Sequence, residues 1–247
     1  MRDAPVLFHD PTSEPSRAVH WFALAAHVAL GVHPIWLSRN EHLGAEFLAI
    51  NPRHQVPALK HGDFCLSEAT AIIRYLAEIN GTAEEWLGAT AVERARINQL
   101  LSWYHTNLRR RSTIEYFLPV LLGPSYCGFA PPPRELIEGL KTNVRAVLEE
   151  VEHFLGTALF LSGTRPTVPD LLFASEIFAL DCDPERESHV AERTRLNPWL
   201  DRMRALPSYA VTHKQWNALV PHLRARLREE PAPGRDPSWV AAICERA

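Results

Sequence analysis

The residues best placed to do chemistry lie between Asn51 and Ala77, where a Val56-Pro57 step precedes a short hairpin and a helix start. The residue before a proline is pushed into extended geometry, and a Val-Pro step in a turn is compatible with a cis peptide bond. Val56 therefore offers its backbone amide and carbonyl to a partner outside the local fold. We interpret this segment as the scaffold of a binding site.

Two elements after Val56-Pro57 are expected to fix the position of this dipeptide. The turn residues His61-Gly62-Asp63 separate Pro57–Lys60 from Phe64–Leu66, which predicts two short antiparallel strands. Ser67 is then expected to cap a helix, because apolar residues follow at helical spacing. These residues are Ile72, Ile73, Leu76 and Ile79.

The chain divides by pattern into an α/β part and a helical part. A strand at Val6–His9, a helix at Pro15–Leu30 and a strand at Ile35–Leu37 precede the hairpin, so residues 1–81 form a small α/β unit. A polar link follows, and residues 92–247 show helical periodicity without a convincing strand. At 247 residues, two modest domains are expected.

Several helices are predicted in the second part. Thr167 followed by Asp170 is a capping box, and it leads into a helix that is apolar nearly all round, which belongs in the middle of a domain. Leu122–Pro133 is rich in Gly and Pro and is predicted as a loop. The other expected helices are Val92–Leu108, Ile137–Leu155, Leu196–Leu206, Ser208–Leu227 and, after a linker from Pro231, a short helix with Trp239.

Composition excludes several function classes. A net charge of -3 gives no electrostatic case for binding nucleic acid or an anionic membrane. No apolar run approaches the ~20 residues of a membrane span, and the first residues lack the apolar core of a signal peptide, so we expect a soluble, cytoplasmic protein. The four cysteines form no C-x-x-C pair and the twelve histidines no H-E-x-x-H motif, so we expect neither a metal nor a dithiol site.

At the Val-Pro hairpin and the helix after it, the chain resembles the N-terminal, thioredoxin-like domain of the cytosolic glutathione transferases. The run VLFHD followed by PTSEPSRAVHWFALAA is similar to the strand, turn and first helix of the theta class. The capping box and central helix resemble the second domain of that family. The resemblance implies a βαβ-α-ββα domain followed by an all-α domain, and a homodimer.

In the theta class the catalytic group is a serine in the first turn, and Ser13 is the matching residue. A free thiol has a pKa near ~8.5, and only the thiolate is a good nucleophile. A hydrogen bond from Ser13 and the dipole of the following helix could together supply the roughly 2.7 kcal/mol that a two-unit decrease in this pKa requires. The alternative is that Ser13 only caps the helix. Thr12, Ser16 and His9 are neighbouring candidates.

The resemblance also assigns the site of the glutathione peptide. His42 matches a side chain at the glycine end of glutathione. Gln55 and Val56, with Pro57, match residues that hold the glycyl carboxylate and the cysteinyl backbone. Each also has a structural interpretation, since a loop glutamine and a surface histidine are common features of solvated loops.

The γ-glutamyl end contains a departure from the family pattern. Glu68 matches the acid that meets the γ-glutamyl ammonium, and the next residue should be a hydroxyl that binds the γ-glutamyl carboxylate. Here it is Ala69, so a hydrogen bond to a charged group, worth roughly 1.5–3 kcal/mol, is absent. Thr70 could compensate only by a local adjustment, and we expect weaker or altered glutathione binding.

The second substrate would meet the helical part. Trp103–Arg110 resembles the fourth helix of the theta class, which places Tyr104 and His105 toward the ligands. Arg109 matches a basic residue that would stabilise the thiolate or a departing halide. Alternatively, it belongs to a solvated run of three arginines. Trp239 matches a tryptophan that closes over the acceptor pocket.

The sequence thus predicts a theta-like glutathione S-transferase, an alkyl or aryl transferase for small electrophilic or halogenated hydrophobic substrates. Isomerisation of an activated double bond stays open, because the same thiolate would serve it. A non-catalytic module for ligand binding or dimerisation also stays open, and Ala69 is the feature that favours it.

Overall fold

The N-terminal part of the chain alternates strands and helices in the computed structural model, which describes residues 4–127, 129–191, 193–229 and 236–247. The elements follow the predicted βαβ-α-ββα order. They are β1 (Val6–His9), α1 (Glu14–Ala25), β2 (Gly31–Pro34), the 3₁₀ turns η1 (Leu37–Arg39) and η2 (Glu41–Leu43), α2 (Ala45–Leu48), β3 (Ala58–His61), β4 (Phe64–Ser67) and α3 (Ala69–Ile79).

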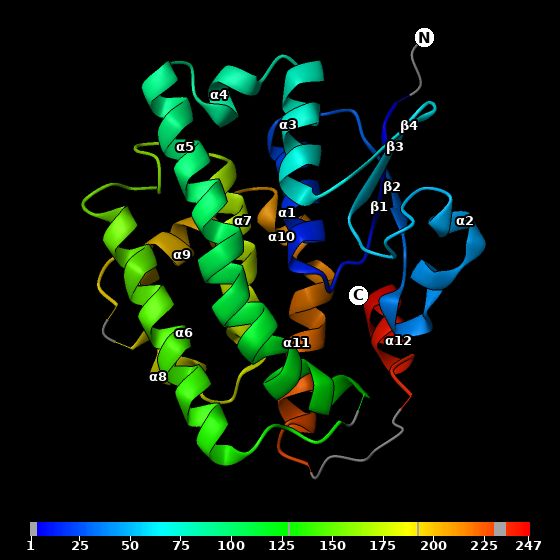
Figure 1. Ribbon diagram of the computed structural model, residues 1–247, viewed down its shortest axis with the longest axis vertical. Helices are drawn as coiled ribbons and strands as arrows, with labels where there is room; N and C mark the ends of the chain where they lie inside the picture. The colour runs from blue at the N-terminus through cyan, green and yellow to red at the C-terminus, as the bar shows by residue number, and fades with distance from the viewer. Residues whose placement is uncertain (1–3, 128, 192, 230–235) are drawn as a thin grey trace.

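The sheet order β2-β1-β3-β4 brings the two predicted site segments together. β1 is parallel to β2 and antiparallel to β3, with Phe8 opposite Ala58. The turn after β1 therefore lies beside the Val56-Pro57 step before β3. In Figure 1, α1 and α3 cover the side of the sheet that faces the helical part, and α2 lies on the other side.

Two boundaries in this part differ from the prediction. β2 occupies Gly31–Pro34 rather than Ile35–Leu37. It is an exposed edge strand held by backbone hydrogen bonds to β1, so it needs no alternation of apolar and polar side chains. α1 ends at Ala25 rather than Leu30, shortly before His27 takes a positive φ of 55°. The backbone at that residue leaves the helical region.

The second part is helical, as predicted. α5 (Ala91–Trp103) continues into η3 (Tyr104–Cys127), a helix of the wider π type that packs against α6 (Arg134–Leu155) and α7 (Val168–Ala179) (Figure 1). The link predicted as irregular contains α4 (Ala83–Leu87). The other elements are η4 (Leu180–Cys182), α8 (Arg186–Val190), α9 (Leu196–Arg204), α10 (Tyr209–Thr212), α11 (Lys214–Arg226) and α12 (Trp239–Arg246).

The loop predicted over Leu122–Pro133 begins later than expected. η3 continues to Cys127 and contains Pro119 and Pro124. A proline removes one backbone hydrogen bond from an α-helix, but this helix already departs from the i→i−4 hydrogen-bond pattern, so the loss is smaller. Most of the linker predicted from Pro231 lies outside the described residues. Where the structure describes the chain, no helix is both long and apolar enough to cross a membrane.

The central helix α7 holds this part together. All its residues are buried, as the apolar pattern predicted, and Thr167 and Asp170 form the predicted capping box. The Asp170 carboxylate accepts hydrogen bonds from the Thr167 amide at 2.9 Å and the Leu161 amide at 2.8 Å. It also accepts one from the Trp199 indole at 2.9 Å, which ties α9 to α7.

We predict that Asp170→Ala lowers the free energy of unfolding by on the order of 3 kcal/mol or more, because several buried donors lose their acceptor. Chemical denaturation measures this loss. Asp201→Ala is the control, since that acid is exposed on α9 and its removal should cost less than about 0.5 kcal/mol. Equal losses in the two variants would contradict the assigned role of Asp170.

Candidate active site

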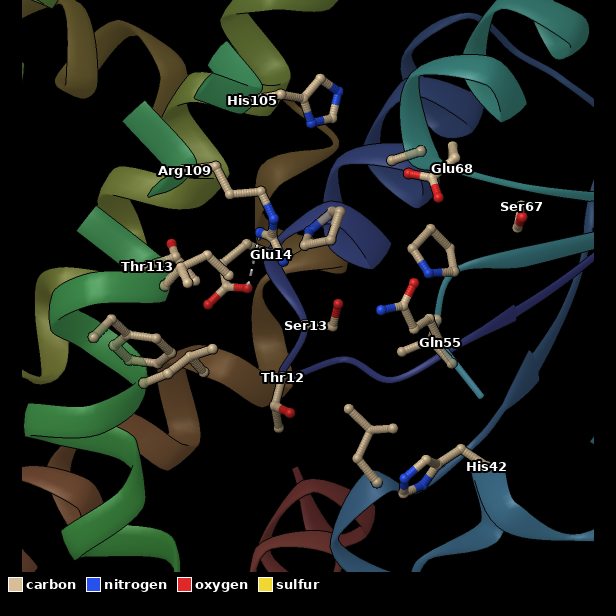
Figure 2. A pocket seen from close by; sticks show the side chains of 18 of the residues that line it. Thr12, Ser13, Glu14, His42, Gln55, Ser67, Glu68, His105, Arg109 and Thr113 are labelled. Carbon is tan, nitrogen blue, oxygen red and sulfur yellow. Dashed lines mark ion pairs between the residues drawn. The ribbon is translucent and has the colours of Figure 1, made fainter. Parts of the chain in front are cut away.

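A cavity of about 510 Å³ lies where the turn after β1, the step before β3 and the start of α3 face η3 (Figure 2). Of the twelve site residues predicted from the sequence, Thr70 and Trp239 do not line it. The other ten do: Ser13, His42, Gln55, Val56, Pro57, Glu68, Ala69, Tyr104, His105 and Arg109. The fold therefore gathers on one cavity residues that are far apart in the sequence.

Ser13 stands at the N-terminus of α1 and faces this cavity. Its backbone is extended, with φ -80° and ψ 123°, and its carbonyl accepts a hydrogen bond from the Arg17 amide at 3.0 Å. Its side chain makes no cap hydrogen bond. The residue has the backbone geometry of a cap, but its hydroxyl is left to donate to another group.

Arg109 points into the cavity, toward Glu14 (Figure 2). Its guanidinium pairs with Glu176 and lies 3.7 Å from the Glu14 carboxylate. Arg110 instead pairs with Glu115 on η3 and Arg111 with Glu150 on α6, and neither arginine lines the cavity. Burial alone would lower the pKa of Arg109, but the charges of Glu176, Tyr104 and Glu14 raise it on balance. Arg109 is thus a fixed positive charge in the cavity wall.

Glu176 anchors this charge and was missed by the sequence analysis. It is fully buried on α7 and accepts hydrogen bonds from Arg109, from Thr113 and from the Tyr104 hydroxyl, the last at 2.5 Å. Burial, and then the charge of Glu176, raise the pKa of Tyr104 well above its usual value. The available signal was an acid inside a helix that is otherwise apolar all round.

Glu14, also missed, lines the cavity immediately after Ser13. Burial raises the pKa of its carboxyl to about 7, and the nearby charge of Glu176 adds to this effect, while Arg109 and Arg17 oppose it. Arg17 is itself fully buried and donates to the carbonyls of the turn. In the sequence, Glu14 looks like an ordinary acid in a first helical turn, and only the tertiary structure reveals its burial.

The Val56-Pro57 peptide bond is cis, and the backbone of Val56 is available to a ligand. Among the described residues, no hydrogen bond uses its amide or its carbonyl. The Gln55 side chain points into the cavity beside it, and the Gln55 carbonyl accepts from the Asn51 amide group at 2.7 Å (Figure 2). His42 faces the same space, and burial followed by the charge of His54 lowers its pKa.

The start of α3 differs from the prediction that Ser67 caps it. Ser67 is the last residue of β4, and Glu68 precedes the helix with a positive φ of 71°. This backbone turns the Glu68 carboxylate toward Arg53, which donates to it at 2.9 Å and to the Ser67 hydroxyl at 2.7 Å. Arg53 was not among the predicted site residues. Ala69 follows as the first residue of α3.

Thr70 and His105 join the two parts of the molecule at the rim of the cavity. The Thr70 hydroxyl lies 3.2 Å from Nε2 of His105. Burial and the charge of Arg109 lower the pKa of His105, which favours the neutral ring. Thr70 is therefore engaged with η3 rather than directed into the cavity.

Trp239 is not brought to the cavity. Val240, Ala241 and Cys244 turn the apolar face of α12 into the core, which leaves Trp239 beneath the guanidinium of Arg226 on α11, 4.1 Å from the ring centre. A sequence can predict such a helix, but the face on which it docks depends on tertiary packing.

Comparisons with known proteins agree with this arrangement. The sequence profile of the family described as "Glutathione S-transferase, N-terminal domain" matches residues 6–78. Human glutathione S-transferase theta-2 is 35% identical over 172 residues, which is 69% of either chain. Mouse glutathione S-transferase theta-1 is 33% identical over 205 residues, 81% of this chain and 82% of the relative.

Solved structures show the same fold over nearly the whole chain. Human glutathione transferase theta-2, in complex with glutathione and an unknown ligand, has a TM-score of 0.80 at 28% identity and covers 98% of this chain and 99% of its own. A human theta-class enzyme with the glutathione conjugate of 1-menaphthyl sulfate has a TM-score of 0.79 at 27% identity over 99% of each chain. The predicted fold class is confirmed.

We predict that Glu14 makes the protein less stable as the pH rises. Its pKa increases from 4.5 to about 7 on folding, so within this window the folded state keeps a proton that the unfolded state has released. The free energy of unfolding should fall across it by on the order of 3 kcal/mol. Glu14→Gln should remove this contribution, and denaturation at a series of pH values measures it. Identical pH profiles for the two proteins would contradict the assignment.

Proposed function

Because the chain belongs to the glutathione S-transferase family, we propose that it binds glutathione in the cavity and that Ser13 stabilises the thiolate for attack on a small electrophilic carbon. The observation that carries the proposal is the Ser13 hydroxyl, which lines the cavity at the N-terminus of α1 without a cap hydrogen bond. A donor in that place adds a charge-assisted hydrogen bond to the favourable end of the helix dipole.

The peptide would lie along the edge formed by the two N-terminal site segments. The free amide and carbonyl of Val56 would pair with the cysteinyl backbone, while Gln55 and His42 would meet the glycyl carboxylate. The exposed pair between Arg53 and Glu68 is weak enough to be exchanged, since each side chain is 56% exposed. The ligand ammonium would therefore replace Arg53 on Glu68.

The acceptor would bind against η3. Ile114, Phe117, Leu118 and Leu122 supply an apolar wall on this side of the cavity, which suits a small hydrophobic electrophile. The thiolate would form a bond to the acceptor carbon while the leaving group departs with its electron pair. Arg109 would stabilise that departing anion. The conjugate bound by the human theta-class relative is consistent with an aromatic acceptor.

Two further expectations stay predictions. They are the homodimer and the cytoplasmic location. Deleting residues 231–247 tests the expectation of a lid: a lid over the acceptor should affect acceptor kinetics more than glutathione affinity, whereas a tail that only packs on α11, as Trp239 does on Arg226, should affect neither.

We predict that Ser13→Ala lowers the turnover of an electrophile by roughly 10- to 100-fold, which is the loss of one hydrogen bond to a charged group. Glutathione should still bind with a Kd near or below roughly 1 mM, because the peptide contacts remain. Calorimetric titration and turnover measurements separate the two effects. Ser102→Ala is the control, since Ser102 is exposed on α5 away from the cavity. Unchanged turnover in Ser13→Ala would refute the serine mechanism.

We predict that Ala69→Ser tightens glutathione binding by up to roughly 10- to 100-fold, because the new hydroxyl can donate to the γ-glutamyl carboxylate beside the free amides of α3. Titration with glutathione measures the change. Ala91→Ser is the matched control, because Ala91 is the first residue of α5 and is exposed. Equal affinities for Ala69→Ser and wild type would count against this account of the γ-glutamyl site.

A further inference from the structure

The Glu14 carboxyl is the least well paired charged group at the cavity. It is 5% exposed and lines the cavity, and it follows Ser13 directly in the chain. Figure 2 shows it directed toward Arg109, and their contact of 3.7 Å is its one ion pair among the described residues. A carboxylate held this way is not neutralised by a close hydrogen-bonded partner.

The charged side chains around Glu14 already have hydrogen-bond partners. The Arg109 guanidinium is hydrogen-bonded to Glu176, which also receives Tyr104 and Thr113. Arg17, on the same helix as Glu14, donates to backbone carbonyls. Two guanidiniums and two carboxyls thus face one another, and Glu14 is the member that can change protonation without breaking a short hydrogen bond.

Within the proposed glutathione chemistry, we propose that Glu14 is the base that accepts the proton of the bound thiol. The S–H bond breaks, the sulfur keeps the electron pair, and a new O–H bond forms on the Glu14 carboxyl. One negative charge disappears from Glu14 as another appears on sulfur, so the net charge of the cavity is unchanged. Arg109 then faces the thiolate and a neutral acid instead of a second carboxylate.

The acidities make this transfer feasible. The groups that face Glu14 are Arg17 on α1, Arg109 on η3 and Glu176 on α7, and together with burial they place the pKa of Glu14 at about 7. A free thiol has a pKa near ~8.5, so transfer without help is disfavoured by roughly 30-fold. The hydrogen bond from Ser13 and the dipole of α1 act on the thiolate in the opposite direction. After the new S–C bond forms, Glu14 returns its proton to solvent.

The test measures how many protons are released to the buffer when glutathione binds. Glutathione binding is followed by calorimetry at pH about 8 in two buffers of different ionisation enthalpy, with the bound thiolate measured by its ultraviolet absorbance. Wild type should release clearly less than one proton per thiolate formed, because the negative charge on sulfur raises the pKa of the nearby Glu14 carboxyl and part of the proton stays there, whereas Glu14→Gln should release about one. Glu14→Asp, which retains a carboxyl, should restore a value below that of Glu14→Gln.

Glu84→Gln is the control, since Glu84 is an exposed acid in the first turn of α4 and its loss should leave the wild-type count unchanged. Release of about one proton per thiolate by the wild type would overturn the proposal for Glu14 and leave glutathione binding intact. Absence of glutathione binding by the wild type would instead overturn the proposed function itself, and with it the role of Glu14.

Discussion

Removing the Arg109 and Glu176 charges from water costs several kcal/mol per ion, and this cost must be offset where the two groups meet. Their hydrogen bond does so together with donors from Tyr104 and Thr113. Because a buried pair is stable in only a narrow set of geometries, it fixes η3 against α7. Arg109 also lies 3.7 Å from Glu14 on α1, so this arginine contacts the helix that begins directly after Ser13.

Much of the fold follows from local patterns. The strand-turn-strand signal around His61-Gly62-Asp63 and the capping box at Thr167 each depend on residues a few positions apart, and both were predicted correctly. The edge strand β2 was placed too late, because its side chains are mostly exposed and its position is set by backbone pairing with β1. The spacing of apolar residues indicates which side chains are buried, and a strand with few buried side chains shows no such spacing.

The site was predicted only as far as the family pattern extends. Ser13 and Glu68 were predicted because they match the family pattern, and both line the cavity. Glu14 and Glu176 were not found, since their environment is created by helices distant in sequence. Trp239 was assigned to the cavity because it matches a tryptophan of the theta class, but in this chain α12 packs so that Trp239 contacts Arg226.

The two ends of the cavity therefore differ in how their charges are held. At the end formed by the start of α3, Glu68 is paired with Arg53 in solvent, where an ion pair contributes little and a ligand can exchange it. At the opposite wall, Glu176 is fully buried and holds the partly buried Arg109. The hydroxyl that Ala69 lacks belongs to this first end. The proposed chemistry depends on the second, where Glu176 fixes the charge of Arg109 before a ligand binds.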